Sequence, residues 1–330
     1  MKKTICLFSL AFFCLFLRAQ ENDDIKKKMQ ATLADKFPET RTIDIRYLHY
    51  LPADFDTELL DEGYQEGKLE KYTKLRVALN VPLLRRPKWN ITSSFSYTND
   101  NLDLRNVSVK SDPLQAPYNR KREFHTFVGA ASFTYFSTLF GKPFIYNSSL
   151  IADASNREIE RLKGFVGASL VIKRTERTMM TVGGVVFIDP ASPLPFAPTF
   201  SVDHKFAGSA WVLDFILPQR LLLKRSLLAN GRISLGSEIA GDALYVNNPL
   251  PGYSSVYTFT QVELRSGLTY EYNIKNLILS FKTGVSTPLS NRLTEKGESA
   301  SDYVLKVNRQ TAGYFSAGVS YNIFGKSSRK

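Results

Sequence analysis

The chain has 330 residues, of which 43% are hydrophobic and 12% aromatic, and its formal net charge is +12. The basic residues are spread along the chain and form no basic helix or recognisable nucleic-acid module, which argues against a nucleic-acid partner. Beyond the first twenty residues, no stretch of eighteen apolar residues occurs, which excludes a membrane-spanning helix there.

The first nineteen residues have the pattern of a secretory signal. Lys2 and Lys3 precede an apolar segment from Ile5 to Leu17, and Ala19 ends a small-residue cleavage site. A membrane anchor helix would need about 20 apolar residues, and this segment is shorter. We therefore predict that residues 1–19 are cleaved on export.

Both cysteines, Cys6 and Cys14, lie in this leader. A lipoprotein signal at Cys14 would require small residues before it, where the sequence has Phe12 and Phe13. The predicted mature chain therefore has no disulfide, thiolate metal ligand or cysteine nucleophile.

Residues 20–41 are predicted to form a periplasmic N-terminal segment. Pro38 would end a short helix over 23–37. The apolar residues of that helix recur every four positions, at Ile25, Met29, Leu33 and Phe37. The spacing leaves open whether the segment stays in the periplasm or enters the barrel described next as a plug.

From residue 42 to 330, the sequence predicts strands and turns. Alternating segments occur at 42–50, 69–82, 88–98, 123–138, 142–153, 159–173, 177–188, 198–206, 208–217, 219–226, 229–240, 255–272, 276–287 and 311–323. Short turns alternate with longer stretches at 51–68, 99–122, 189–197, 241–254 and 288–310, which are rich in Gly, Pro, Asn and charge. Short periplasmic turns and longer outer loops are typical of outer-membrane barrels. The segments number fourteen, and twelve strands stays open because two connections on the long side are short.

Each segment has an apolar and a polar face, because successive strand side chains point to opposite sides. In 88–98, the apolar face has Trp89, Ile91, Phe95 and Tyr97, and the other face has Asn, Thr and Ser. A soluble sandwich or lipocalin-like barrel has the same alternation. Aromatic residues near strand ends, the number of strands and the small polar residues favour an all-β, closed, up-and-down antiparallel transmembrane β-barrel.

The last segment has the clearest alternation. Phe315, Val319 and Tyr321 share one face, and Ser316 and Ser320 share the other. A strand of this kind near the C-terminus of an exported chain predicts the bacterial outer membrane, with recognition by the barrel assembly machinery. Membrane lipid and lipopolysaccharide are the other expected partners.

Three sequence features together resemble an uncharacterised, porin-like outer-membrane β-barrel family of the Bacteroidetes. They are the segments Phe187-Ile188-Asp189-Pro190 and Asp214-Phe215-Ile216-Leu217-Pro218 and the closing Tyr321-Asn322-Ile323-Phe324. The resemblance covers most of the mature chain and implies the same barrel. It differs at the end of the chain, where six residues follow Phe324.

The three histidines, His49, His125 and His204, all fall on apolar faces. No serine and histidine stand at a spacing that favours a catalytic pair, and no histidine–carboxylate cluster has metal-ligand spacing. We therefore predict no enzyme, cofactor or metal site. A barrel enzyme that acts on lipid is the least favoured alternative.

Charged side chains on the polar faces are predicted to line the lumen: Lys74, Arg76, Arg161, Lys163, Arg232, Glu238, Glu263, Arg265, Glu271 and Lys282. Isolated charges are costly to bury, so this set implies water or paired networks inside. The excess of bases predicts a porin-like passive channel for small, anionic solutes. The alternative is a structural or surface-interaction barrel whose lumen is occluded by salt-bridged side chains.

Overall fold

The computed structural model describes residues 38–112, 114–189, 192, 195–248 and 254–322. The predicted leader, the helix predicted over 23–37 and Phe324 lie outside these residues. A short 3-10 helix, η1 (Pro38–Thr40), precedes the first strand. No helix among the described residues is long and apolar enough to cross a bilayer.

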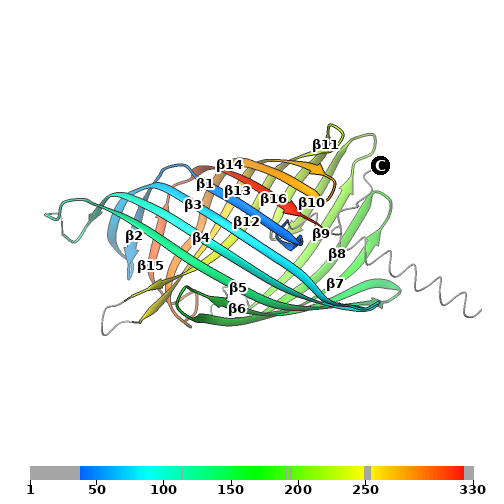
Figure 1. Ribbon diagram of the computed structural model, residues 1–330, viewed down its shortest axis with the longest axis horizontal. Helices are drawn as coiled ribbons and strands as arrows, with labels where there is room; N and C mark the ends of the chain where they lie inside the picture. Colours follow the sequence, from blue (N-terminus) through cyan, green and yellow to red (C-terminus); the bar gives the residue numbers. More distant parts are fainter. Residues whose placement is uncertain (1–37, 113, 190–191, 193–194, 249–253, 323–330) are drawn as a thin grey trace, which may run out of the picture.

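All strands belong to one antiparallel sheet, which closes into a barrel (Figure 1). The strands are β1 (Ile43–Tyr50), β2 (Ala53–Leu59), β3 (Glu62–Arg85), β4 (Trp89–Val109), β5 (Tyr118–Leu139), β6 (Lys142–Ala154), β7 (Ile159–Arg174), β8 (Thr178–Ile188), β9 (Phe196–Lys205), β10 (Trp211–Leu217), β11 (Arg220–Leu227), β12 (Gly231–Asn247), β13 (Val256–Ile274), β14 (Leu277–Glu295), β15 (Tyr303–Arg309) and β16 (Ala312–Tyr321).

The barrel is a ring of 14 strands, because two of them are interrupted. Strands β1 and β2 follow one another along the same edge of β3, and β16 and β15 do the same along β14. Pro52 stands at the first interruption, where its missing N–H cannot join the ladder. The prediction of a closed up-and-down barrel with fourteen strands is confirmed.

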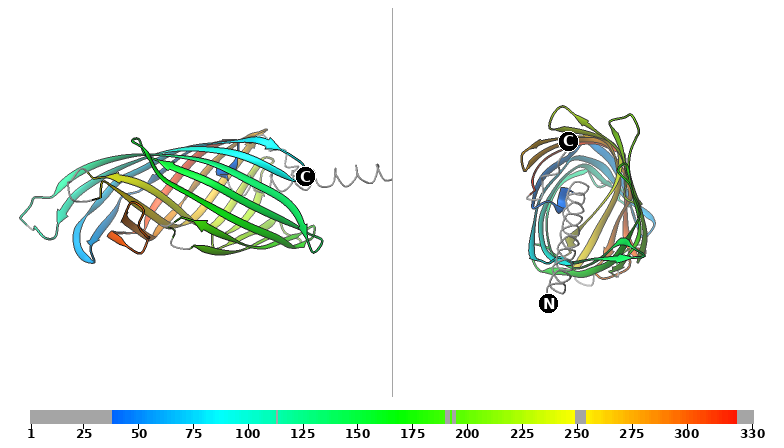
Figure 2. Two further views of the ribbon diagram at one scale, coloured as in Figure 1. Left: turned by 90° about the horizontal axis from the view of Figure 1, so that it is seen from below. Right: turned by 90° about the vertical axis from the view of Figure 1, so that its right-hand side faces the viewer.

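The wall of the barrel is much taller on one side than on the other. Strands β3, β4 and β5 have 24, 21 and 22 residues, whereas β10 and β11 have 7 and 8. Figure 1 shows β2, β15 and the far ends of β4 and β5 extending well beyond the short strands β8–β11. The end-on view in Figure 2 shows the strands arranged as an oval ring.

The prediction of long outer loops is wrong for most of their length. Strand β2 and the start of β3 fill 51–68, with a tight turn in which Leu60 and Asp61 adopt positive φ angles. Strand β4 continues to Val109, and β12 and β14 continue to Asn247 and Glu295. Charge and Asn favoured loops in the prediction, but these residues are the water-facing side of strands that continue beyond the lipid.

An apolar belt surrounds the part of the barrel that is nearer the chain termini. Its outward side chains are large and exposed, for example Leu79 (40%), Phe95 (49%) and Phe281 (48%). An exposed apolar surface that continues from strand to strand is typical of a wall in contact with lipid.

Beyond the belt, the two faces of the wall exchange character. On β4, the outward residues change from Phe95 and Tyr97 to Asn101 and Asp103, while the inward residues change from serine and threonine to Leu102 and Leu104. We call this part the outer wall; it comprises β2, β15 and residues 62–71, 99–109 and 118–125. Its polar outside and apolar inside are those of a protein surrounded by water.

Candidate functional site: a bridged lumen and an outer pocket

Side chains from neighbouring and from more distant strands meet inside the barrel, near the boundary between the belt and the outer wall. The rings of Tyr50 and Tyr72 stack with centroids 4.8 Å apart, and both side chains are buried. We call the surrounding set the septum; it consists of Tyr50, Tyr72, Lys74, Asp100, Asp242, Gln261, Glu263, Arg265 and Arg309.

Two contacts of the septum connect strands that are distant in the ring. The hydroxyl of Tyr72 on β3 lies 3.0 Å from Oε1 of Gln261 on β13, with β1, β16 and β14 between the two strands. Lys74 Nζ donates to Asp242 Oδ2 on β12 at 2.8 Å and lies 3.3 Å from Asp100. These contacts span the lumen rather than follow its wall.

Glu263 is the centre of the septum. Its carboxylate accepts hydrogen bonds from the Tyr50 hydroxyl and from Ser286, and it pairs with Arg265 and Arg309. Arg265 also donates to the Tyr50 hydroxyl at 2.8 Å. Each buried charge therefore has an opposite charge and hydrogen bonds, which is the condition for burying ions at tolerable cost.

A second network lies closer to the chain termini. Arg41 donates to Glu271 at 2.8 Å, and Arg232 pairs with the other oxygen of the same carboxylate. Lys282 pairs with Glu238 on β12. These ion pairs connect strands of the belt below the septum.

A third group joins β6 and β7 to β12, which is distant from them in the ring. Lys163 donates to Asp153 at 2.5 Å, and the hydroxyl of Tyr245 donates to the same carboxylate at 3.0 Å. Asp153 is on β6 and Tyr245 on β12, and five strands separate these in the ring. Arg161 pairs with Asp189.

The structure places the ten residues predicted to line the lumen on the face opposite the belt. Nine of them form the ion pairs described for the three networks. The tenth, Arg76, lies two positions from Lys74 on the same face of β3. The structure joins six of them directly to one another, in the pairs Glu238–Lys282, Glu263–Arg265 and Arg232–Glu271, and Arg41 also binds Glu271.

Sequence reasoning missed the acidic partners of the remaining bases. Asp100, Asp189 and Asp242 lie in ranges predicted as loops, and Asp153 lies in a predicted strand but is not among the predicted lumen residues. The alternation of inward and outward side chains could have identified two of these acids as lumen residues. Asp100 continues the inward positions of β4, and Asp242 continues those of β12. These acids offset the excess of positive charge from which an anion preference was predicted.

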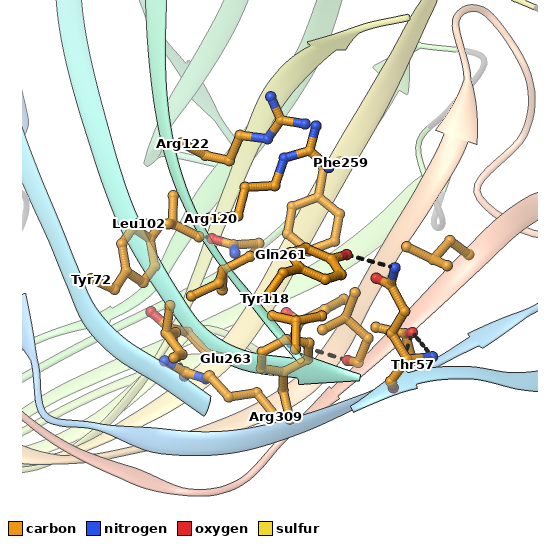
Figure 3. A pocket seen from close by; sticks show the side chains of 18 residues that line it. Thr57, Tyr72, Leu102, Tyr118, Arg120, Arg122, Phe259, Gln261, Glu263 and Arg309 are labelled. Atoms are coloured by element: carbon orange, nitrogen blue, oxygen red, sulfur yellow. Dashed lines mark hydrogen bonds and ion pairs between the residues drawn. The ribbon is translucent and has the colours of Figure 1, made fainter. Parts of the chain in front are cut away.

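A pocket lies within the outer wall, directly beyond the septum (Figure 3). Its cavity volume is about 230 Å³. Most of its lining is apolar or aromatic, with Phe55, Leu69, Leu102, Leu104 and Phe259 among the walls. Its polar lining includes Gln261 and Glu263, which the pocket shares with the septum, and Arg120, Arg122 and Arg309.

The histidines have structural contacts in the described residues. His125 Nδ1 lies 2.9 Å from the Tyr97 hydroxyl, and His204 Nδ1 lies 2.8 Å from Thr178 Oγ1. The His49 ring packs 4.9 Å from that of Phe315. None of these contacts brings a serine to a histidine.

The closed ring, the exposed belt and the paired interior define a transmembrane β-barrel whose lumen is bridged by side chains. No family model matches the chain, and no curated protein matches it. The resemblance to a Bacteroidetes barrel family therefore stays a prediction.

Several solved structures align with most of the chain. The transport unit of the autotransporter AIDA-I from Escherichia coli has 9% identity and a TM-score of 0.31, over 86% of this chain and 90% of that one. The toluene transporter TodX from P. putida has 9% identity and a TM-score of 0.31, over 85% of this chain and 89% of that one. The outer membrane protease OmpT from Escherichia coli has 8% identity and a TM-score of 0.31, over 84% of this chain and 96% of that one. Likeness at this level assigns no function, and the fold described above rests on the strand pairing itself.

Proposed function

We propose that the protein is a barrel of the bacterial outer membrane that admits small organic solutes through a lumen closed at rest by the septum. The belt supports a membrane location, and the predicted leader supports export. The observation that carries the proposal is the polar septum between an outer pocket and the rest of the lumen.

The septum is made of ion pairs and hydroxyl contacts rather than of close-packed aliphatic side chains. Such pairs can exchange partners with water or with a charged solute, so the closed state need not be permanent. This distinguishes the proposal from an always-open porin, in which the lumen contains a continuous water column.

Flux into liposomes tests the proposal. Reconstituted barrel should admit acetate and chloride faster than protein-free liposomes, while sucrose stays excluded. Flux of all three at the protein-free rate would contradict the proposal.

That result would favour a second candidate, a surface-interaction barrel with a permanently occluded lumen. The observation that favours it is the hydrogen bond from Tyr245 on β12 to Asp153 on β6, which joins two strands that five others separate in the ring. This candidate predicts no flux even after the septum is weakened. In both candidates the protein has no catalytic role.

A further inference from the structure

The outer pocket contains two cationic side chains without a counter-ion. Arg120 and Arg122 line it from β5, and no hydrogen bond or ion pair within the described part of the chain reaches either guanidinium. Elsewhere in the lumen the bases are matched with carboxylates, as in the three networks above. Arg120 and Arg122 are exposed at the water-facing end of the pocket, two positions apart on the same face of β5, so an anion that enters the pocket from water can reach both.

The neighbouring strands explain why these two charges stay unmatched. In the register of β4 and β5, Arg120 is opposite Leu104 and Arg122 is opposite Leu102. On the other edge of β5, strand β6 ends at Ala154, opposite Phe127, and so does not reach the arginines. Strand β4 therefore places leucine opposite each arginine, and on the other edge of β5 no strand residue is paired with either of them.

The one carboxylate in the lining is already engaged. Glu263 pairs with Arg265 and Arg309 and accepts from Tyr50 and Ser286. It therefore leaves the charge of Arg120 and Arg122 uncompensated. Partial burial and the neighbouring Arg120 lower the pKa of Arg122 from its usual value, as expected for two like charges held together.

The rest of the pocket is suited to an apolar body. Figure 3 shows the two guanidinium groups together at one end, with Phe259, Leu102 and Tyr118 beside them. A cavity of about 230 Å³ holds roughly eight non-hydrogen atoms, taking about 30 Å³ for each water-sized atom. That is the size of one aromatic ring or a short alkyl chain.

We infer that this pocket binds small carboxylates with an apolar body, such as arylcarboxylates and short-chain alkyl carboxylates, with the carboxylate at Arg120 and Arg122. A planar guanidinium matches a carboxylate with two parallel hydrogen bonds, which lysine cannot supply. The inference names the solute class of the proposed uptake and rests on that proposal for its biological direction.

Binding to the intact barrel in lipid nanodiscs tests the inference by calorimetry, with protein-free discs as the blank. Benzoate and hexanoate are the probes. Benzyl alcohol has the apolar body without the charge, and acetate has the charge without the body. We expect one site per barrel for both probes and at least tenfold weaker binding of benzyl alcohol and of acetate.

Three consecutive residues supply matched variants. Arg120→Gln and Arg122→Gln should each weaken benzoate binding about tenfold or more, the loss expected for a hydrogen bond to a charged group. Lys121→Gln removes the same charge from the outward face between them and should leave the affinity unchanged.

The inference is overturned if wild-type barrel binds neither probe. It is also overturned if Lys121→Gln weakens binding as much as Arg122→Gln, or if benzyl alcohol or acetate binds as tightly as benzoate. This experiment measures binding and not flux. Binding without flux would therefore contradict the proposed uptake function and leave the binding site supported.

Discussion

The hydroxyl of Tyr72 on β3 lies 3.0 Å from Oε1 of Gln261 on β13, across the lumen of the barrel. The same hydroxyl lies 2.8 Å from Asp100, on the strand next to its own. One side chain therefore joins β4, the neighbour of its own strand, to β13, which is four strands away from β3 in the ring. In the closed lumen that we propose, contacts of this kind connect the strands across the interior of the barrel.

A double-mutant cycle measures this contact. Tyr72→Phe and Gln261→Ala should show a coupling energy of about 0.5–1.5 kcal/mol, the usual net value of a hydrogen bond. The measurement is urea unfolding of the barrel in liposomes. Asn291→Ala is the control partner, since Asn291 lines the pocket but bonds to Val307 instead. Equal coupling in both cycles would show that the Tyr72–Gln261 contact has no energetic weight.

The boundary between belt and outer wall is testable on one strand. Phe95→Arg should lower the free energy of unfolding by roughly 2–4 kcal/mol, because it places a charge in the hydrocarbon. Asn101→Arg is on the same face of β4, beyond the boundary, and should change it by less than about 0.5 kcal/mol. Similar losses for the two variants in liposomes would mean that the belt ends elsewhere.

The outer wall should loosen in acid at the junction of β2 and β15. Hydrogen bonds from Asn308 and Lys306 lower the pKa of Glu58 below its usual 4.5. A lowered folded-state pKa stabilises the fold above 4.5, and that contribution is lost as pH falls through the folded value. Hydrogen exchange of β15, corrected for intrinsic rates, should therefore accelerate as the pH falls below 4.5.

The matched variant for this effect is Glu58→Gln, which cannot titrate. Its β15 exchange should already be fast at pH 7 and should show no further acceleration in acid from this site. An unchanged pH profile in Glu58→Gln would assign the loosening to other groups.

Alternation predicted the strands well where lipid touches one face. Apart from their first residues, the segments 88–98 and 276–287 lie inside β4 and β14, because water on one side and hydrocarbon on the other enforce a period of two. Beyond the belt the strands continue to alternate, but the apolar face and the polar face are exchanged. There the apolar residues, such as Leu102 and Leu104, point inward, and the outward Asn and Asp resembled a loop.

The septum was beyond sequence reasoning for a different reason. Strand periodicity tells which face a residue occupies but not which residue of a distant strand it meets. Lys74 and Asp242 are 168 positions apart and become neighbours only through the closure of the ring. Most bases of the networks and the acids Glu238, Glu263 and Glu271 were therefore predictable, while the pairing between them required the three-dimensional structure.

Ion conductance in planar bilayers tests the closed lumen most directly. The septum variant carries Tyr72→Ala and Lys74→Ala, and the control carries Thr73→Ala and Leu75→Ala on the opposite face of β3. With equal folded fractions, we expect low, mostly closed conductance for wild type and control, and a mean conductance several-fold higher for the septum variant. A wild type that already conducts as well as the septum variant would contradict a lumen closed at this level.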